Sequence, residues 1–224
     1  MIVKIKRQSS MESKPYWQSF RYEGPLHITV SALLDTLNYT DDLYDIEGKP
    51  AERIRFECSC MQAMCGGCAM VINGVPALAC SVFADEVKAE QLVLEPLSKF
   101  PVVADLMVDR SIIYENLNKV QAYLTQPSVY DDRQHAQQYS VAKCLKCGLC
   151  LEVCPNYRPE SEFFGAVLAN ESYLIASSTK DKNAPIIKEY KTHFGAGCSK
   201  ALSCQSVCPM KIETLTSILR MNRK

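Results

Sequence analysis

Twelve cysteines occur among the 224 residues, and most of them fall in groups with regular spacing. The run CLKCGLCLEVCP, over 144–155, follows the pattern C-x2-C-x2-C-x3-C-P. A second run, CSKALSCQSVCP over 198–209, repeats this pattern, but Ala201 stands where its second cysteine is expected. Thiolates at such spacings hold iron–sulfur clusters, and in this pattern the fourth cysteine of one run ligates the cluster of the other. The two runs therefore predict two neighbouring clusters that carry single electrons.

Crosswise pairing of the two runs gives unequal ligand sets. The first set has four thiolates, enough for a [4Fe–4S] cluster, from Cys144, Cys147, Cys150 and Cys208. The second set has three thiolates, from Cys154, Cys198 and Cys204. Because a cubane needs one ligand for each iron and Ala201 cannot ligate, the second set predicts a [3Fe–4S] cluster. The alternative is a [4Fe–4S] cluster with water or another oxygen at its fourth iron, for which Ser199 and Ser203 are nearby candidates.

A third cysteine group lies upstream and has the spacing C-x4-C-x2-C, followed after eleven residues by a last cysteine. Its members are Cys60, Cys65, Cys68 and Cys80. This is the spacing of plant-type [2Fe–2S] centres. Gly66 and Gly67 lack a Cβ, which allows the loop to curl around a cluster. A zinc knuckle is the alternative, but structural zinc sites usually use two close cysteine pairs, and this group has only one.

Some residues near these groups have no assigned ligand role. Cys58 is left over, and we interpret it as a small buried hydrophobe, the usual role of a free cysteine. On a strand Cys58 points to the same side as Cys60, so the alternative is that it exchanges with a ligand of the binuclear cluster or serves as one.

The flanking lysines either form a solvated face or raise reduction potentials electrostatically. They are Lys143, Lys146, Lys200 and Lys211.

Composition excludes several classes of protein. Lys+Arg and Asp+Glu both number 25, and such a balance lacks the basic footprint of a nucleic-acid-binding protein. The first ten residues have no apolar signal core, and no stretch approaches the 18 apolar residues of a transmembrane helix. We therefore expect the chain to lie in a reducing compartment, where cysteines bind iron–sulfur clusters more often than they form disulfides. No G-x-G-x-x-G occurs, so we expect no flavin or nicotinamide site and no catalytic residue on this chain.

The elements that must position the cysteines differ between the two halves. Strands are predicted at 1–8, 15–23, 53–58 and 91–96, with a hairpin turn at Asn73-Gly74 and a helix at 30–37 capped by Ser31. Helices are predicted at 102–124, 163–177, 184–194 and 214–221, and 126–139 is predicted as a linker or covering loop. The fold class is therefore α+β, strand-rich first and helical second.

The order of the three cysteine groups resembles the iron–sulfur subunits of succinate dehydrogenase and fumarate reductase over nearly the whole chain. The segments PYWQSF, LLDTL, CGGCAMVING and ALAC agree as well. The resemblance implies a β-grasp plant-type ferredoxin domain over 1–104. It also implies an all-α bacterial-ferredoxin-like domain over 105–224, with [2Fe–2S], [4Fe–4S] and [3Fe–4S] centres in a line.

The resemblance also implies a function. Electrons would pass between an FAD-containing flavoprotein subunit, which interconverts succinate and fumarate in either direction, and a quinone bound by a membrane anchor subunit. The chain would be a peripheral subunit at the cytoplasmic face of the cell membrane. Where ubiquinone-linked members have tryptophans and a histidine, this chain has PNYRPESEFFG and Ser199, which argues against a ubiquinone site like theirs. The PESEFFGA stretch resembles the fumarate reductase side of the family. His193 is expected to be a packing or surface residue, with a place near the quinone as the alternative.

A second function remains open beside this one. The chain could instead carry electrons within a soluble flavoprotein complex that uses no quinone. Such a complex would be a fumarate reductase linked to thiols or another donor, or a hydroxyacid oxidase.

Overall fold

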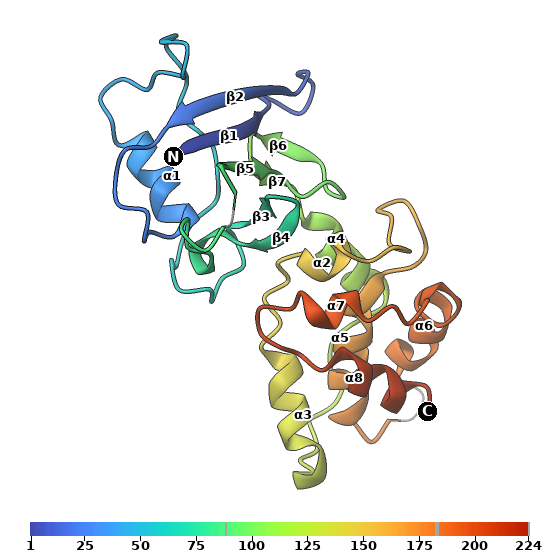
Figure 1. The fold of residues 1–224 in the computed structure, drawn as a ribbon. Helices are drawn as coiled ribbons and strands as arrows, with labels where there is room; N and C mark the ends of the chain where they lie inside the picture. Colours follow the sequence, from blue (N-terminus) through green and yellow to red (C-terminus); the bar gives the residue numbers. More distant parts are fainter. Residues whose placement is uncertain (88, 182–183, 224) are drawn as a thin grey trace. The chain divides into compact units, whose positions relative to one another are not determined.

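The structure is a computed structural model that describes residues 1–87, 89–181 and 184–223. It contains two compact units, Met1–Asp109 and Arg110–Lys224 (Figure 1). Among the described residues, every strand lies in the first unit, and the second unit is built from helices. A sheet domain followed by a helical part confirms the mixed class predicted from the sequence. The domain boundary between 104 and 105 stays a prediction, and the compact units divide a few residues later.

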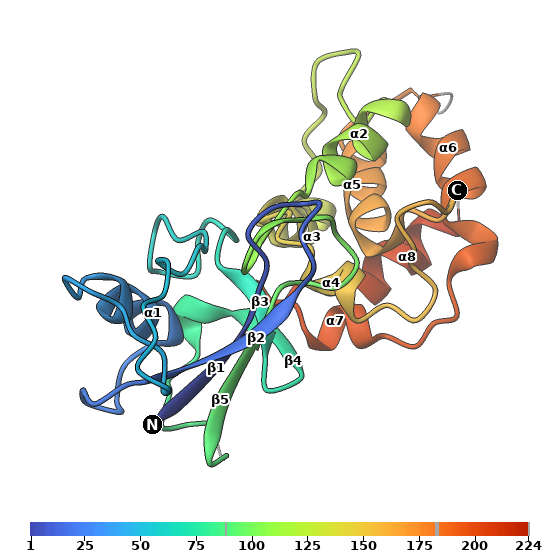
Figure 2. The ribbon, with the colours of Figure 1, turned by 90° about the horizontal axis from the view of Figure 1, so that it is seen from above.

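Five strands form the main sheet of the first unit, in the order β2-β1-β5-β3-β4 (Figures 1 and 2). Their bounds are β1 Ile2–Arg7, β2 Tyr16–Arg21, β3 Ala69–Ile72, β4 Val75–Leu78 and β5 Gln91–Glu95. β1 pairs antiparallel with β2 and parallel with β5. The β3–β4 hairpin turns through Asn73 and Gly74, whose φ angles of 45° and 79° are the left-handed values that a two-residue turn requires. The turn predicted from the sequence is therefore confirmed.

The core of the first unit forms between the sheet and α1, Val30–Asn38. Val3 and Ile5 alternate with partly exposed residues along β1 and are fully buried, as expected when successive side chains of a strand point to opposite faces. Leu33 and Leu34 of α1 are also fully buried. Both elements therefore bury apolar side chains in the interior of the first unit.

The cap of α1 is Thr29, whose hydroxyl accepts a hydrogen bond from the Ala32 N–H at 3.3 Å. The prediction of Ser31 as the cap is wrong. The helix begins at Val30, so Ser31 lies inside its first turn, where it is fully buried.

The segment 53–58, predicted as a strand, belongs to none of the strands in the described chain. Its alternation is real, because Ile54 is buried between the exposed Arg53 and Arg55. However, its backbone pairs with side chains and with the backbone N–H of Leu106, which lies outside the strands, instead of with a strand. Ile54 exchanges two hydrogen bonds of 2.8 Å with the side-chain amide of Asn38. The strand prediction is wrong because alternation does not reveal which groups will satisfy the backbone.

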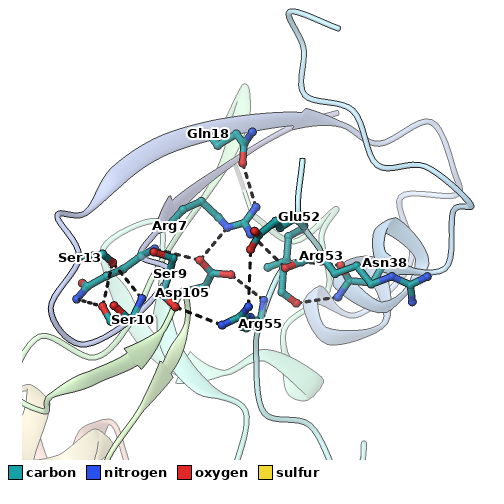
Figure 3. Close-up of polar contacts among 12 residues, drawn as sticks. Arg7, Ser9, Ser10, Ser13, Gln18, Asn38, Glu52, Arg53, Arg55 and Asp105 are labelled. Carbon is teal, nitrogen blue, oxygen red and sulfur yellow. Dashed lines mark hydrogen bonds and ion pairs between the residues drawn. The ribbon is translucent and has the colours of Figure 1, made fainter. Parts of the chain in front are cut away.

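Asp105, near the end of the first unit, binds segment 53–58 through a hydrogen bond (Figure 3). One carboxylate oxygen accepts from the Gln8 N–H at 3.0 Å, and the other accepts from the Arg55 N–H at 2.9 Å. Arg7 donates to the carbonyl oxygens of residues 52 and 53, both at 3.1 Å. One polar cluster thus joins β1, the approach to the first cysteine loop and the end of the unit.

The helix predicted over 102–124 is wrong in its first part. Val102–Ala104 (β6) and Met107–Val108 (β7) form a short hairpin that turns at Asp105, whose φ is 47°. Only Ser111–Lys119, α2, is helical. The β-branched residues at the start of this segment and the long-range contacts of Asp105 override the helical spacing.

The second unit is organised around α5, Gly165–Ser177, with α3, α6 and α8 packed against it (Figure 1). The other bounds are α3 Asp132–Ala142, α4 Leu149–Glu152, α6 Pro185–His193, α7 Ser203–Ser206 and α8 Thr214–Met221. The helices predicted at 163–177, 184–194 and 214–221 are confirmed. The linker predicted at 126–139 is wrong from Asp132 onward, because Asp131 caps α3 by accepting from the Arg133 N–H at 3.0 Å. In the described parts of the chain, no helix is both long and apolar enough to cross a membrane.

Candidate iron–sulfur centres

The first cysteine loop, residues 58–68, curls so that backbone N–H groups face its sulfur atoms. Met61 and Ala63 have left-handed φ angles of 54° and 55°. The Met64 N–H donates to Cys60 Sγ at 3.3 Å, and the Ala63 N–H donates to Cys80 Sγ at 3.2 Å. Amides turned inward in this way form a concave site that favours anionic sulfur.

The remaining thiols of this group come from the loop and from the two ends of the β3–β4 hairpin. Cys68 directly precedes β3, and Cys80 lies in a helical turn that directly follows β4. Their sulfur atoms are 3.3 Å apart. Cys65 contacts Cys60 through its side chain. The hairpin therefore brings the predicted fourth ligand back to the loop, and the four cysteines predicted for [2Fe–2S] share one site.

The four thiols of this site differ in their ease of ionisation. Hydrogen bonds from the N–H groups of Gln62 and Met64 lower the pKa of Cys60 to about 7. Burial raises the pKa of Cys68 to about 12. Because the thiolate is the metal ligand, iron binding at the buried side of the site must release protons.

Cys58 lies next to this site without completing it. Its Sγ is 2.8 Å from Met61 Sδ, and the residue is partly buried. Burial raises the pKa of the Cys58 thiol. A partly buried thiol in contact with a thioether supports the packing role expected from the sequence.

A cavity in the helical unit is lined by all four cysteines predicted for the [4Fe–4S] cluster. They are Cys144, Cys147, Cys150 and Cys208. Val167 and Ile212 form part of the cavity's apolar wall. Burial raises the pKa of Cys147 to about 11 and raises that of Cys150 well above its ordinary value. Four thiols surround one apolar cavity, with Cys147 buried and the other three half-buried. This arrangement fits a cluster that brings its own positive charge as iron.

The third cysteine group adjoins this cavity through Cys204, which also lines it. Burial raises the pKa of Cys204, and negative charge on Cys154 and Cys198 raises it further. The three thiols predicted for [3Fe–4S] are therefore close enough to interact electrostatically.

The two cysteine runs have the same backbone shape. The second residue after the first cysteine is left-handed in both runs, with φ 54° at Lys146 and 59° at Lys200. A second left-handed residue follows, with φ 86° at Gly148 and 59° at Leu202. Gly148 directly precedes the one-turn helix α4, and Leu202 directly precedes the one-turn helix α7. The runs are therefore structural repeats, as their spacing predicts.

Within this shared shape, Ala201 takes the place of Cys147. Cys147 is buried in the cavity, whereas Ala201 is exposed. The Ser203 hydroxyl donates to the Val153 carbonyl oxygen at 3.2 Å, so this candidate oxygen ligand is already engaged. The set of three thiolates at the third site stays a prediction.

The four flanking lysines are not equivalent. Lys143, Lys200 and Lys211 are exposed. Lys146 lines the cavity, is 19% exposed at its side chain, and forms an ion pair with Glu171 of α5, which is 12% exposed. Sequence reasoning missed Glu171, because nothing in the spacing connects α5 to the first cysteine run.

His193 has a packing role. Its ring stacks on Phe164 with 4.2 Å between the centroids. Its Nδ1 lies 2.9 Å from the Glu162 carbonyl oxygen, and the residue is 5% exposed. These contacts support the role expected from the sequence.

The three sites suit iron–sulfur clusters by the chemistry of their donors, since each combines several thiols with inward amides or apolar walls. Among the residues described, no group of three or more His, Cys, Asp or Glu side chains is arranged to hold a single metal ion. A cluster spreads its ligands over several irons and sulfides. The fold and the sites therefore define an iron–sulfur electron carrier with separate binuclear and dicluster parts.

Comparison with known proteins identifies the family. The chain matches a 2Fe-2S iron-sulfur cluster binding domain over residues 2–115 and a 4Fe-4S dicluster domain over 140–212. It is 32% identical to the succinate dehydrogenase iron-sulfur subunit of Bacillus subtilis, over 98% of this chain and 90% of that protein. It is 29% identical to the fumarate reductase iron-sulfur subunit of an Escherichia coli strain, over 96% and 88%.

A solved structure supports the same fold. The Sdh1 complex of Mycobacterium smegmatis in the apo form contains a chain that superposes with a TM-score of 0.75 at 21% identity, over 100% of this chain and 96% of that chain. The protein belongs to the family of succinate dehydrogenase and fumarate reductase iron–sulfur subunits. It is thus an electron-transfer subunit of an oxidoreductase complex, with no substrate chemistry of its own.

Proposed function

We propose that this chain relays single electrons between an FAD-containing flavoprotein subunit and a quinone bound by a membrane anchor subunit, in a succinate:quinone or quinol:fumarate oxidoreductase. The observation that carries the proposal is the presence of three cysteine sites on one chain that resembles such subunits over almost its whole length. The proposed location is the cytoplasmic face of the cell membrane, where the anchor subunit holds the chain.

The proposed ligand sets follow the three sites. Cys60, Cys65, Cys68 and Cys80 hold [2Fe–2S]; Cys144, Cys147, Cys150 and Cys208 hold [4Fe–4S]; Cys154, Cys198 and Cys204 hold [3Fe–4S]. When bound, these clusters supply the one-electron chemistry. The sheet unit would then have the β-grasp ferredoxin fold, and the helical unit the bacterial-ferredoxin-like fold.

The chain's own residues hold and insulate these centres. In the first site, the Met64 and Ala63 N–H groups donate to cysteine sulfur and so stabilise its negative charge. In the second site, Val167 and Ile212 keep water from part of the cavity wall. Hydrogen bonds to sulfur, net charge and solvent exposure are the properties by which a protein sets cluster potentials.

The test is purification of the intact complex through an affinity tag on this chain, from detergent-solubilised membranes and, in parallel, from the soluble fraction. We expect a flavoprotein and a multi-span membrane subunit to copurify, and quinol to be oxidised when fumarate is supplied. Recovery of an active complex without detergent, with electrons taken from a thiol or another soluble donor and no quinone reactivity, would favour the alternative of a soluble flavoprotein complex.

Electron paramagnetic resonance of the same complex tests the third site. The air-oxidised complex is expected to give the isotropic signal of an oxidised [3Fe–4S] centre. Two cubane signals on reduction, with no such signal in the oxidised state, would contradict the three-thiolate assignment based on Ala201.

A further inference from the structure

Lys146 and Glu171 form an ion pair that is largely withdrawn from solvent, with side-chain exposures of 19% and 12%. Such pairs are uncommon, because both charges must be taken out of water. Their position is specific. Lys146 lies between two cysteines of the first run and lines the cavity, whereas Glu171 is not among the residues that line it. The cation of the pair is therefore the member nearer to the proposed cluster.

The backbone of Lys146 also serves this cavity. Its left-handed φ of 54° directs its N–H to the sulfur of Cys144. The ammonium charge of the same residue interacts with the Cys144 thiolate. Glu171, held on α5, keeps the lysine side chain in place through the ion pair.

We propose that Lys146, positioned by Glu171, raises the reduction potential of the cluster held in the Cys144 cavity. The inference rests on the proposed function, which places a [4Fe–4S] cluster there. Reduction adds one electron, and hence one negative charge, to the cluster. A cation in a poorly hydrated wall stabilises this added charge more than a solvated cation does, because solvent screens it less. Glu171 opposes the effect from farther away, so the net field of the pair favours the reduced state.

Lys143 provides the matched control. It belongs to the same stretch of chain and carries the same charge, but its side chain is exposed. Its Nζ lies 4.4 Å from the centre of the Tyr139 ring. Its removal changes the net charge of the chain as much as removal of Lys146 does. If only the total charge mattered, the two changes would have equal effects.

The experiment is a potentiometric titration of the [4Fe–4S] centre, followed by electron paramagnetic resonance, in the intact complex and its variants. We expect Lys146→Met to lower the midpoint potential and Glu171→Gln to raise it, because the second change leaves the cation uncompensated. Lys146→Arg should stay near the wild-type potential, and Lys143→Met should shift it much less than Lys146→Met does. A merely structural role for the pair would not produce shifts of opposite sign.

Two results would overturn the proposal. One is equal shifts in Lys146→Met and Lys143→Met, and the other is shifts of the same sign in Lys146→Met and Glu171→Gln. If Lys146→Met fails to assemble the cluster, Glu171→Gln decides alone, and an unchanged or lower potential contradicts the proposal. Absence of a [4Fe–4S] centre from the wild-type complex would instead refute the proposed function, so the two failures are distinguishable.

Discussion

The guanidinium of Arg7 and the carboxylate of Asp105 form an ion pair inside the sheet unit, with 2.9 Å between Arg7 Nε and Asp105 Oδ1 (Figure 3). Both side chains are almost fully buried. The contact is electrostatic, since Nε makes no well-directed hydrogen bond. The pair joins β1 to the turn at Asp105, far along the chain. Asp105 also binds the segment that leads into the first cysteine loop.

Replacing Asp105 by Asn is expected to lower the free energy of unfolding of the sheet unit by about 3–5 kcal/mol, because Arg7 then becomes a buried charge without a counter-ion. Guanidinium unfolding of the cluster-loaded chain, followed by the visible circular dichroism of the [2Fe–2S] centre, measures this change. Glu95→Gln is the control. It removes a much more exposed pair with Lys6, at 3.3 Å, for which about 1 kcal/mol or less is expected. Equal losses of unfolding free energy in the two variants would show that burial of the Arg7–Asp105 pair does not raise its contribution to stability.

Asn73 supports the hairpin that carries Cys68 and Cys80 at its ends. Its Oδ1 accepts from the Val93 N–H at 2.7 Å, and its Nδ2 donates to the Gln91 carbonyl oxygen at 3.0 Å. Asn73→Ala removes both bonds and places alanine at a positive φ, so we expect a loss of about 1–3 kcal/mol.

Asn73→Gly separates the two causes of this loss. Glycine keeps the left-handed backbone without strain but makes no side-chain hydrogen bonds, so this variant should lose less stability than Asn73→Ala. Thermal unfolding and the content of [2Fe–2S] in both variants provide the measurements. A glycine variant less stable than the alanine variant would show that backbone strain is not part of the cost.

Removal of iron is expected to leave thiols of very different reactivity. Cys60 has a pKa of about 7 because of the Gln62 and Met64 N–H groups, and burial raises the pKa of Cys147 to about 11. Since the thiolate is the reacting form, a brief pulse of iodoacetamide near pH 8 should label Cys60 about tenfold or more faster than Cys147, because the larger ionised fraction of Cys60 outweighs its lower intrinsic nucleophilicity.

The pH dependence of labelling gives a second check. The rate at Cys60 should rise with pH and level off above its pKa of about 7, where the thiol is already ionised. The rate at Cys147 should keep rising well beyond that point, by about tenfold per pH unit, because its pKa is about 11. Mass spectrometry of the labelled peptides measures both rates. Equal rates at the two sites would mean that the cavity around Cys147 does not persist without iron.

Ala201→Cys is expected to convert the third centre to [4Fe–4S]. The backbone at Lys200 and Leu202 already has the left-handed conformation found at Lys146 and Gly148, so a thiol at 201 would stand where Cys147 stands in the first run. Loss of the [3Fe–4S] resonance from the oxidised complex and a gain of one iron per chain are the expected observations. Ala201→Ser tests whether an oxygen ligand suffices. An unchanged resonance in the cysteine variant would mean that position 201 does not face the cluster.

Local sequence determined much of this protein. Cysteine spacing predicts the types of cluster and the unequal ligand sets, because metal ligation tolerates few arrangements along a chain. The Asn73-Gly74 turn and the helices α1, α5, α6 and α8 are also predictable, since each depends on turn chemistry or on an apolar period within the element itself.

Tertiary contacts decided the remainder. The segment 53–58 alternates like a strand, yet it pairs with side chains of Asn38 and Asp105. The segment after residue 101 has helical spacing, yet it forms a hairpin fixed by Asp105. Lys146 resembles its three exposed counterparts in sequence, and only the packing of α5 supplies Glu171 and removes it from solvent. In each case the outcome depends on which distant group satisfies a charge or a backbone bond, and no periodicity along the chain contains that information.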